Sequence, residues 1–401
     1  MASPAKWVTC GADDVSAWGE AKGSGAKPYQ VAVDLRGPAF KCSCPSRKIP
    51  CKHTLGLLLR VAAGQAPTDS APDWVRDWLD KRTEKQTEKA ASPKAEADPE
   101  ASAKRADQRW RKILSGLDEC EAFLIDVAGR GLLSAQSARS WDQMAARAVD
   151  AQAPGIARKL KHVGSRIGVG VDWSLEAAAE MGNVTLLIEA ARRAESLNDA
   201  KRADVATALG IPVRKGDLAG ERVADVWDVL GQAVEQEDRV TVFRTWLRGR
   251  ASERWAMHLS FSVAGQAPEL RLAPGSALVA ELEFYPSAWP LRAQIGEISM
   301  AQFKPQLGGG WESILEQMSL ALTACPWLEQ VPACVVNARL GRTDAGWWAI
   351  DAEGAAVGVR GCELWELLAR TGNEPCNLFG EFNGLEFRPL SAWGSWGFFA
   401  L

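Results

Sequence analysis

The sequence predicts a multidomain α+β protein in four parts: a small ββα module, a flexible charged linker, an α-helical middle domain and a C-terminal α+β domain with an antiparallel sheet. Three observations predict this organisation. Three cysteines and a histidine gather within twelve residues, from Cys42 to His53. A polar, charged stretch separates this cluster from the rest of the 401-residue chain. Beyond that stretch, apolar residues first follow a helical period and later alternate as in strands.

The cluster has the spacing of a metal site. It reads C-x-C-x6-C-x-H, with Cys42, Cys44, Cys51 and His53 as candidate ligands. Three thiolates and one imidazole complete a tetrahedral shell around a structural Zn²⁺, and such a closed shell leaves no open position for a catalytic water. Disulfide bonding is the alternative, but cysteines two residues apart rarely bridge each other, and a disulfide leaves the histidine unexplained. The pattern therefore predicts one bound zinc.

This ligand pattern, followed by the apolar run Thr54–Ala63, resembles the SWIM zinc finger. The resemblance covers residues 1–64 and implies a small ββα zinc module that binds DNA or proteins, with the four cluster residues as ligands. The remaining chain resembles the long companion region of bacterial SWIM-finger proteins. Those proteins are often encoded beside a MoxR-type AAA+ ATPase and a von Willebrand A-type protein. The second resemblance therefore implies a protein partner of that kind.

The module, residues 1–64, is predicted to consist of a hairpin and a helix. We expect strands at Tyr29–Leu35 and Phe40–Cys44, joined by a turn at Arg36-Gly37-Pro38. The helix Thr54–Ala63 is expected to end at Gly64. A hairpin this small is marginal by itself, so the metal should supply much of the folding free energy.

Residues 65–107 are predicted to be a linker. Between Asp80 and Asp107 the chain has no large apolar residue, and such a segment cannot bury enough surface to offset its chain entropy. Within the linker, Trp74 and Trp78 lie at i and i+4 and would share one helix face. We expect them to pack on a neighbouring domain rather than to dock a peptide.

Residues 108–250 are predicted to form an α-helical bundle or a short helical array. Apolar residues recur there at helical spacing, and Gly, Pro and Asp separate the runs. The last helix of this domain is expected at Glu221–Arg248. No fixed repeat period is evident.

Residues 251–401 change character and predict an α+β domain built on an antiparallel sheet. The expected strands are Trp255–Val263 and Ala277–Tyr285, with a hairpin at Phe379–Phe387 and helices at Trp311–Leu322 and Cys362–Arg370. Nine of the eighteen tryptophans lie in this part, which favours a large aromatic core over an exposed aromatic patch for a partner.

Charge is distributed unevenly along the chain. The net charge is −3, yet residues 1–64 hold nine Lys or Arg and four Asp or Glu, a formal charge of +5. Four of the basic residues flank or separate the ligands: Lys41, Arg47, Lys48 and Lys52. Such a patch is the electrostatic footprint of a phosphate contact, which predicts nucleic acid, with DNA favoured. A solvated surface without a partner is the alternative.

Composition also bounds the location of the protein. No uninterrupted apolar run is long enough for a membrane span, and the N-terminus lacks the apolar core of a signal peptide. The cysteines outside the cluster are scattered, which suits a reducing compartment. We therefore expect a cytoplasmic protein without membrane contact.

Three classes of function remain. The first is a non-catalytic adaptor that binds nucleic acid through the basic finger, and it predicts a continuous positive surface. The second is a protein-interaction scaffold working with an AAA+ ATPase or a von Willebrand A-type partner, and it predicts an exposed apolar patch. The third is an enzyme whose residues converge only in the folded chain. The sequence contains no P-loop and identifies no catalytic or cofactor-binding residue, so we do not expect an enzyme.

Overall fold

The computed structural model describes most of the chain, and contacts divide it into two compact units. The described residues are 3–23, 27–36, 39–46, 50–91, 99–135, 137–213, 218, 220–237, 240–263, 270–305, 307–361 and 363–401. The finger unit comprises Met1–Asp98, Gln236–Thr241 and Phe261–Glu269. The main unit comprises Pro99–Glu235, Val242–Ser260 and Leu270–Leu401.

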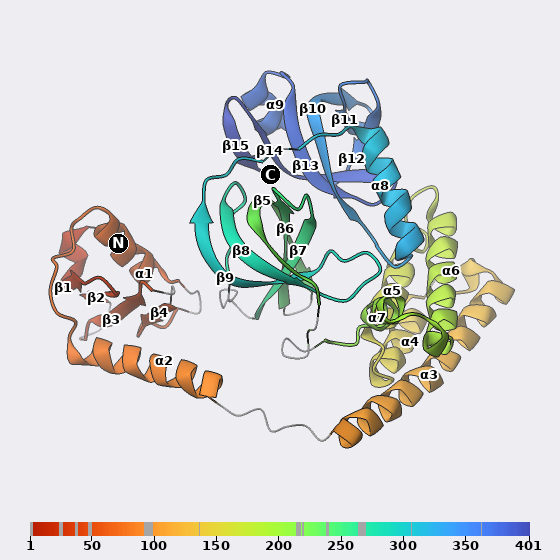
Figure 1. The fold of residues 1–401 in the computed structure, drawn as a ribbon, viewed down its shortest axis with the longest axis horizontal. Helices are drawn as coiled ribbons and strands as arrows, with labels where there is room; N and C mark the ends of the chain where they lie inside the picture. Colours follow the sequence, from red (N-terminus) through yellow and green to blue (C-terminus); the bar gives the residue numbers. More distant parts are fainter. Residues whose placement is uncertain are drawn as a thin grey trace. The chain divides into compact units, whose positions relative to one another are not determined.

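The finger unit contains a four-stranded antiparallel sheet in the order β1-β2-β3-β4 (Figure 1). Its elements are a 3-10 turn at Pro4–Lys6, β1 Trp7–Ala12, β2 Ser16–Ala21, β3 Tyr29–Asp34, β4 Ala39–Cys42, α1 Lys52–Ala62 and α2 Asp73–Ala91. The predicted hairpin and helix are confirmed as β3, β4 and α1. The hairpin β1–β2 was not predicted, because β2 is rich in Ala and Gly, which carry little β-propensity, although β1 begins with the strand-forming residues Trp, Val and Thr.

Both faces of this sheet are covered. Val33 of β3 belongs to a core cluster with Leu57 of α1, whereas Ala32 belongs to a second cluster with Val75 and Leu79 of α2. This division follows from the period of two along a strand. Trp74 and Trp78 are partly buried against the second cluster, as expected for packing on a neighbouring fold.

The region predicted as a flexible charged linker carries helix at both ends. α2 continues to Ala91, and α3 (Pro99–Arg130) begins well before Asp107. The described residues between Asp80 and Asp107 are therefore helical, and their role as a linker stays a prediction. The segment consists mostly of Ala, Glu, Lys and Gln, which are strong helix formers. Its polar composition therefore argues against a hydrophobic core but is compatible with a helix.

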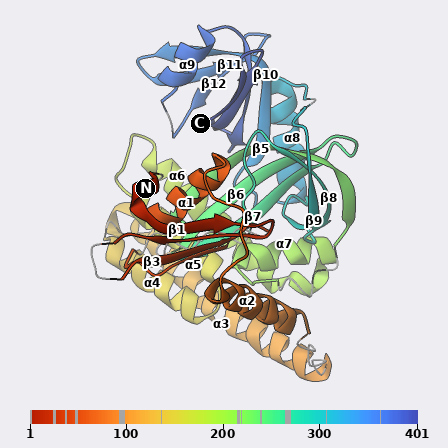
Figure 2. The ribbon, with the colours of Figure 1, turned by 90° about the vertical axis from the view of Figure 1, so that its left-hand side faces the viewer.

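In the described first part of the main unit, helices α3 to α7 form a bundle (Figure 2). They are α3, α4 Ala138–Asp150, α5 Pro154–Arg166, α6 Trp173–Arg192 and α7 Asp199–Leu209, with short 3-10 turns at Leu132–Ala135 and Ala194–Ser196. Their shared core includes Ile113, Trp141, Leu160 and Leu187. No helix in the described part of the chain is long and apolar enough to span a membrane.

The helix predicted at Glu221–Arg248 is wrong. The segment forms two strands, β5 Arg222–Glu237 and β6 Val240–Gly249. Trp227, Val229 and Leu230 are all fully buried, so β5 is covered on both faces and does not alternate between apolar and polar residues. Without that alternation, the spacing of its apolar residues resembled a helical period.

β5 and β6 belong to a five-stranded sheet in the order β7-β6-β5-β8-β9. The other strands are β7 Trp255–Val263, β8 Ala277–Phe284 and β9 Ala293–Ala301. Met257 of β7 and Arg292, which precedes β9, form a parallel bridge between the two outer strands. The sheet thus curls into a barrel, called the first barrel below, whose core includes Trp227, Leu247 and Phe284.

The C-terminal sheet has the order β12-β11-β10-β13-β14-β15, and a parallel pairing of β12 with β14 closes it into the second barrel. Its elements are α8 Trp311–Ala324, β10 Val331–Thr343, β11 Gly346–Ile350, β12 Ala356–Val359, α9 Trp365–Thr371, β13 Cys376–Phe382, β14 Glu386–Gly394 and β15 Gly397–Ala400. The predicted helices at Trp311–Leu322 and up to Arg370 are confirmed, although Cys362 lies outside the described residues.

The two barrels share one strand connectivity. In each, the first strand pairs with the second and the fourth, and the third meets the fifth in a parallel contact. This is the connectivity of the five-stranded Greek-key barrel known as the OB-fold. In the second barrel α9 lies between the third and fourth strands, which is also the place of the helix in that fold.

An apolar cluster joins the two barrels. Leu230 and Trp246 of the first barrel pack with Cys334, Phe379 and Leu390 of the second. The strands approach closely here, because a Cβ on Gly231 would lie 2.9 Å from the Phe379 ring and from Leu390. Most tryptophans of this half therefore contribute to cores and junctions, as the sequence suggested.

Candidate metal centre

The four predicted ligands meet where β4 ends and α1 begins. Cys42 is the last residue of β4, Cys51 is the N-cap of α1, and His53 lies in the first turn of that helix. The ligand atoms of Cys42, Cys44, Cys51 and His53 all lie within 4.8 Å of one another. Cys51 and His53 are buried, whereas Cys42 and Cys44 are half-buried. The strand end and the helix start thus bring both halves of the motif together.

The distances suit a tetrahedral site. His53 Nδ1 lies 3.8 Å from the Sγ of Cys42 and 3.8 Å from the Sγ of Cys51. Bonds of about 2.0–2.3 Å place neighbouring ligand atoms of a tetrahedral zinc roughly 3.5–4 Å apart, so only small adjustments are needed for coordination. The thiols are not paired in disulfides. The cluster is therefore arranged for metal binding, consistent with one structural zinc.

Neighbouring groups orient the ligands. The hydroxyl of Thr54 lies 3.4 Å from the Sγ of Cys51, and the Tyr29 ring lies 5.1 Å from the His53 ring. Burial raises the pKa of the Cys42 thiol to about 12. Burial also opposes ionisation of Cys51, but hydrogen bonds from Thr54 and Cys42 outweigh it and lower the pKa of that thiol to about 6. A divalent cation would stabilise both thiolates together.

Of the four predicted contact residues, two are described. Lys41 and Lys52 are exposed, and each is adjacent in sequence to a ligand. The Nζ of Lys41 lies 5.8 Å from the centre of the Trp74 ring. Arg47 and Lys48 lie outside the described residues, so their contact with a partner stays a prediction.

The surface of α1 also carries apolar side chains. Leu55 is 48 % exposed and Leu59 is 62 % exposed, and the two lie one turn apart. Lys52 precedes them on the same helix by one turn. The finger therefore presents both a positive and an apolar feature.

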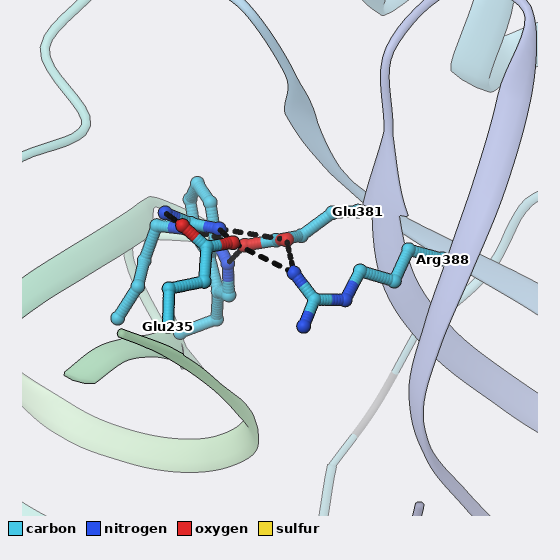
Figure 3. Close-up of polar contacts among 5 residues, drawn as sticks. Glu235, Glu381 and Arg388 are labelled. Atoms are coloured by element: carbon cyan, nitrogen blue, oxygen red, sulfur yellow. Dashed lines mark hydrogen bonds and ion pairs between the residues drawn. The ribbon is translucent and has the colours of Figure 1, made fainter. Parts of the chain in front are cut away.

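A second polar cluster, in the main unit, was not predicted. Glu381 of β13 is fully buried and accepts hydrogen bonds from Arg244 Nε at 2.5 Å and from Trp246 Nε1 at 2.8 Å. Arg244 and Arg388 also bond to Glu235, at 2.8 and 2.7 Å (Figure 3). Desolvation opposes the charge of Arg244, but bonds to Glu381 outweigh it and raise its pKa. The only local signal was a glutamate within an otherwise apolar strand, Phe379–Phe382.

Two family models match the chain. Residues 29–62 match the SWIM zinc finger, and residues 108–209 match the SWIM-associated four-helix bundle domain. No curated protein and no solved structure matches the chain significantly. The resemblance recognised from the ligand spacing is thus confirmed, and the match to the companion region covers the helical bundle.

Proposed function

We propose that this protein, with its SWIM zinc finger, is a non-catalytic adaptor whose finger binds nucleic acid, preferably DNA, through Lys41, Arg47, Lys48 and Lys52. One observation carries the proposal: exposed Lys41 and Lys52 sit directly beside the ligands Cys42 and Cys51. A bound metal would fix the backbone at both positions while both side chains stay exposed to a phosphate.

The charge balance of the finger supports this role. Residues 1–64 contain four acidic residues. One of them, Asp34, is buried and forms ion pairs with Arg36 and Arg82 at 3.3 Å, so it adds little negative charge to the surface. α1 begins at Lys52, and the N-terminus of a helix carries partial positive charge. We expect contact mostly with phosphate, with modest affinity, little sequence preference and a log–log salt slope of roughly −2 to −4.

A binding titration tests the proposal. Full-length, zinc-loaded protein is titrated into labelled duplex DNA, single-stranded DNA and RNA at several salt concentrations. The double variants K41E/K52E and R47E/K48E should weaken binding to every sequence and flatten the salt slope. The control K161E/K201E makes the same charge change at two exposed lysines of the bundle and should bind like the wild type. Failure of all three nucleic acids to bind at low salt would remove the proposal.

A protein-interaction scaffold is the second candidate, and the exposed Leu55 and Leu59 favour it. An apolar pair on a helix surface suits a protein partner better than a phosphate backbone. The resemblance to bacterial SWIM-finger proteins points to a MoxR-type AAA+ ATPase or a von Willebrand A-type protein. A pull-down of the intact protein with nuclease treatment distinguishes the two candidates. A protein partner that remains bound after nuclease treatment, and that the variant L55D/L59D no longer binds, supports the scaffold.

We also propose a cytoplasmic location, supported by free thiols at the eight described cysteines. The division into domains at 1–64, 65–107, 108–250 and 251–401 is a prediction that we modify. We propose that the finger extends through the start of α2, and that the boundary between the helical and the barrel regions follows α7, near residue 210. Limited proteolysis would cut at these boundaries.

A further inference from the structure

The main unit contains a polar pocket of about 580 Å³, called the junction pocket here. It lies between the helical bundle, the two barrels and the segment Leu328–Gln330. Its lining includes Arg158, Lys159, His162, Glu180, Asn183, Glu235, Arg244, Glu329, Arg360 and Asn383. Arg360 follows the third strand of the second barrel, and Asn383 lies between its fourth and fifth strands.

The carboxylates of the junction pocket are already engaged. Glu180 bonds to Lys159 at 2.9 Å, and Glu329 bonds to Arg158 at 3.0 Å. Glu235 bonds to Arg244 and Arg388, as described above. Each acidic side chain in the lining therefore has at least one cationic partner, whereas a further cation of the lining forms no ion pair with the described residues.

Arg360 is that further cation. Its Nε is buried and has no hydrogen-bond partner among the residues that the structure describes. Its backbone N–H donates to the carbonyl of Phe387 at 2.9 Å, which anchors the residue at the edge of the second barrel. Arg360 as a whole is half-buried, so only its Nε is removed from water without an acceptor, and an anion in the pocket would supply that acceptor.

A smaller, mostly apolar pocket of about 280 Å³ adjoins the first and shares part of its lining, including Arg158, Arg244 and Glu329. Half-buried aromatic and aliphatic side chains line it: Met257, Leu259, Trp289 and Trp327. At its edge Arg292 stacks on the Tyr285 ring, with 4.1 Å between the guanidinium carbon and the ring centre. Such walls suit a flat aromatic ring.

We propose that the junction pocket and its apolar neighbour together bind a small ligand in which an anionic group, phosphate or carboxylate, is joined to an aromatic ring. Arg360 receives the anion, with Asn383 and His162 beside it in the lining. The ring enters the apolar pocket between Trp289 and Trp327. This site lies in the main unit and does not depend on what the finger binds.

Calorimetry on the full-length, zinc-loaded protein tests the proposal with four probes. Adenosine 5′-monophosphate joins phosphate to a ring, and indole-3-acetate joins carboxylate to a ring. Adenosine lacks the anion, and inorganic phosphate lacks the ring. At least one of the first two should bind about tenfold more tightly than both of the last two. Which of the two binds identifies the anion.

The variants localise the site. R360Q should weaken the binding probe by about tenfold or more, and R360K, which keeps the charge, should fall between R360Q and the wild type. The control R139Q removes an exposed arginine of α4 outside both pockets and should bind like the wild type. The thermal transition of each variant reports its folding. Binding of none of the probes by the wild type, or equal affinities across wild type, R360K and R360Q, would overturn the proposal.

Discussion

The finger unit and the main unit differ in how many large side chains they bury. Of the twelve largest side chains that are fully buried among the described residues, eleven belong to the main unit, including Trp227, Trp311 and Phe379. The finger unit contributes Leu57. Because a small core offsets less of the chain entropy of its own residues, we expect the finger to depend on its metal and the main unit to depend on burial. The following predictions test that difference, in order of decreasing effect.

Loss of the metal should have the largest effect, and it should be confined to the finger unit. Native protein should contain about one zinc per chain, and C42A/C51A or a strong chelator should abolish metal binding and unfold the finger. Hydrogen exchange should then show deprotected amides in β3 and α1, with the bundle and barrels unchanged. The control C325A/C376A changes two cysteines outside the cluster and should retain zinc. A large shift in the main thermal transition on chelation would contradict this independence.

Truncation of a core side chain in the main unit should destabilise that unit and leave the metal site of the finger intact. Trp311 is 1 % exposed, donates through Nε1 to the carbonyl of Ala349 at 2.8 Å, and packs against Phe382 and Phe387. W311A should lower the free energy of unfolding of the main unit by about 3–5 kcal/mol and leave the zinc content unchanged. Urea denaturation measures the loss. The control W365A removes a tryptophan that is 57 % exposed and should cost clearly less.

The buried ion pairs between the barrels should contribute a smaller amount. E381Q removes the charge of the fully buried Glu381 and leaves Arg244, whose side chain is largely buried, with Glu235 as its remaining carboxylate partner; it should destabilise the main unit by about 3 kcal/mol. E386Q changes an exposed glutamate near the start of the next strand and should have little effect. Equal unfolding midpoints for the two variants would contradict the prediction, because they would show that the charge of Glu381 does not stabilise the main unit.

The smallest effect on stability is expected at the basic surface. K41E/K52E should change the free energy of unfolding by no more than about 0.5 kcal/mol, because both side chains are exposed. The zinc content should also stay at the wild-type level. A loss of zinc in this variant would mean that the lysines support the metal site, and their effect on nucleic-acid binding would then be indirect.

The metal centre was predictable because its parts are close in sequence. Cys42 and His53 are eleven residues apart, and the chemistry of the four side chains is visible in the local pattern. The cluster around Glu381 was not predictable, since Arg244 lies 137 residues away and nothing local links the two. Arg360 likewise gave no signal, because the role proposed for it depends on residues of the bundle and of both barrels.

The prediction of strands from the sequence failed where a strand is buried on both faces, because such a strand lacks the alternation of apolar and polar residues from which strands are recognised. β8, with alternating buried and exposed residues over part of its length, was predicted close to its observed bounds. β5 is buried on both faces between Trp227 and Gly231, and it was predicted as helix. The shared connectivity of the two barrels also escaped notice, because connectivity is a property of strand pairing and leaves no fixed period in the sequence.

The connectivity of the barrels also bears on the order in which the chain folds. Each barrel must join its first strand to its fourth across two intervening strands, as in the pairing of Arg222 with Glu283. Such nonlocal pairing requires the closure of a long loop and is slow, whereas the helices of the bundle largely contact neighbours in sequence. During synthesis, the finger and the bundle emerge before the barrels and can fold while the barrels are still incomplete. The slowest steps thus fall in a part of the chain that is synthesised after the bundle.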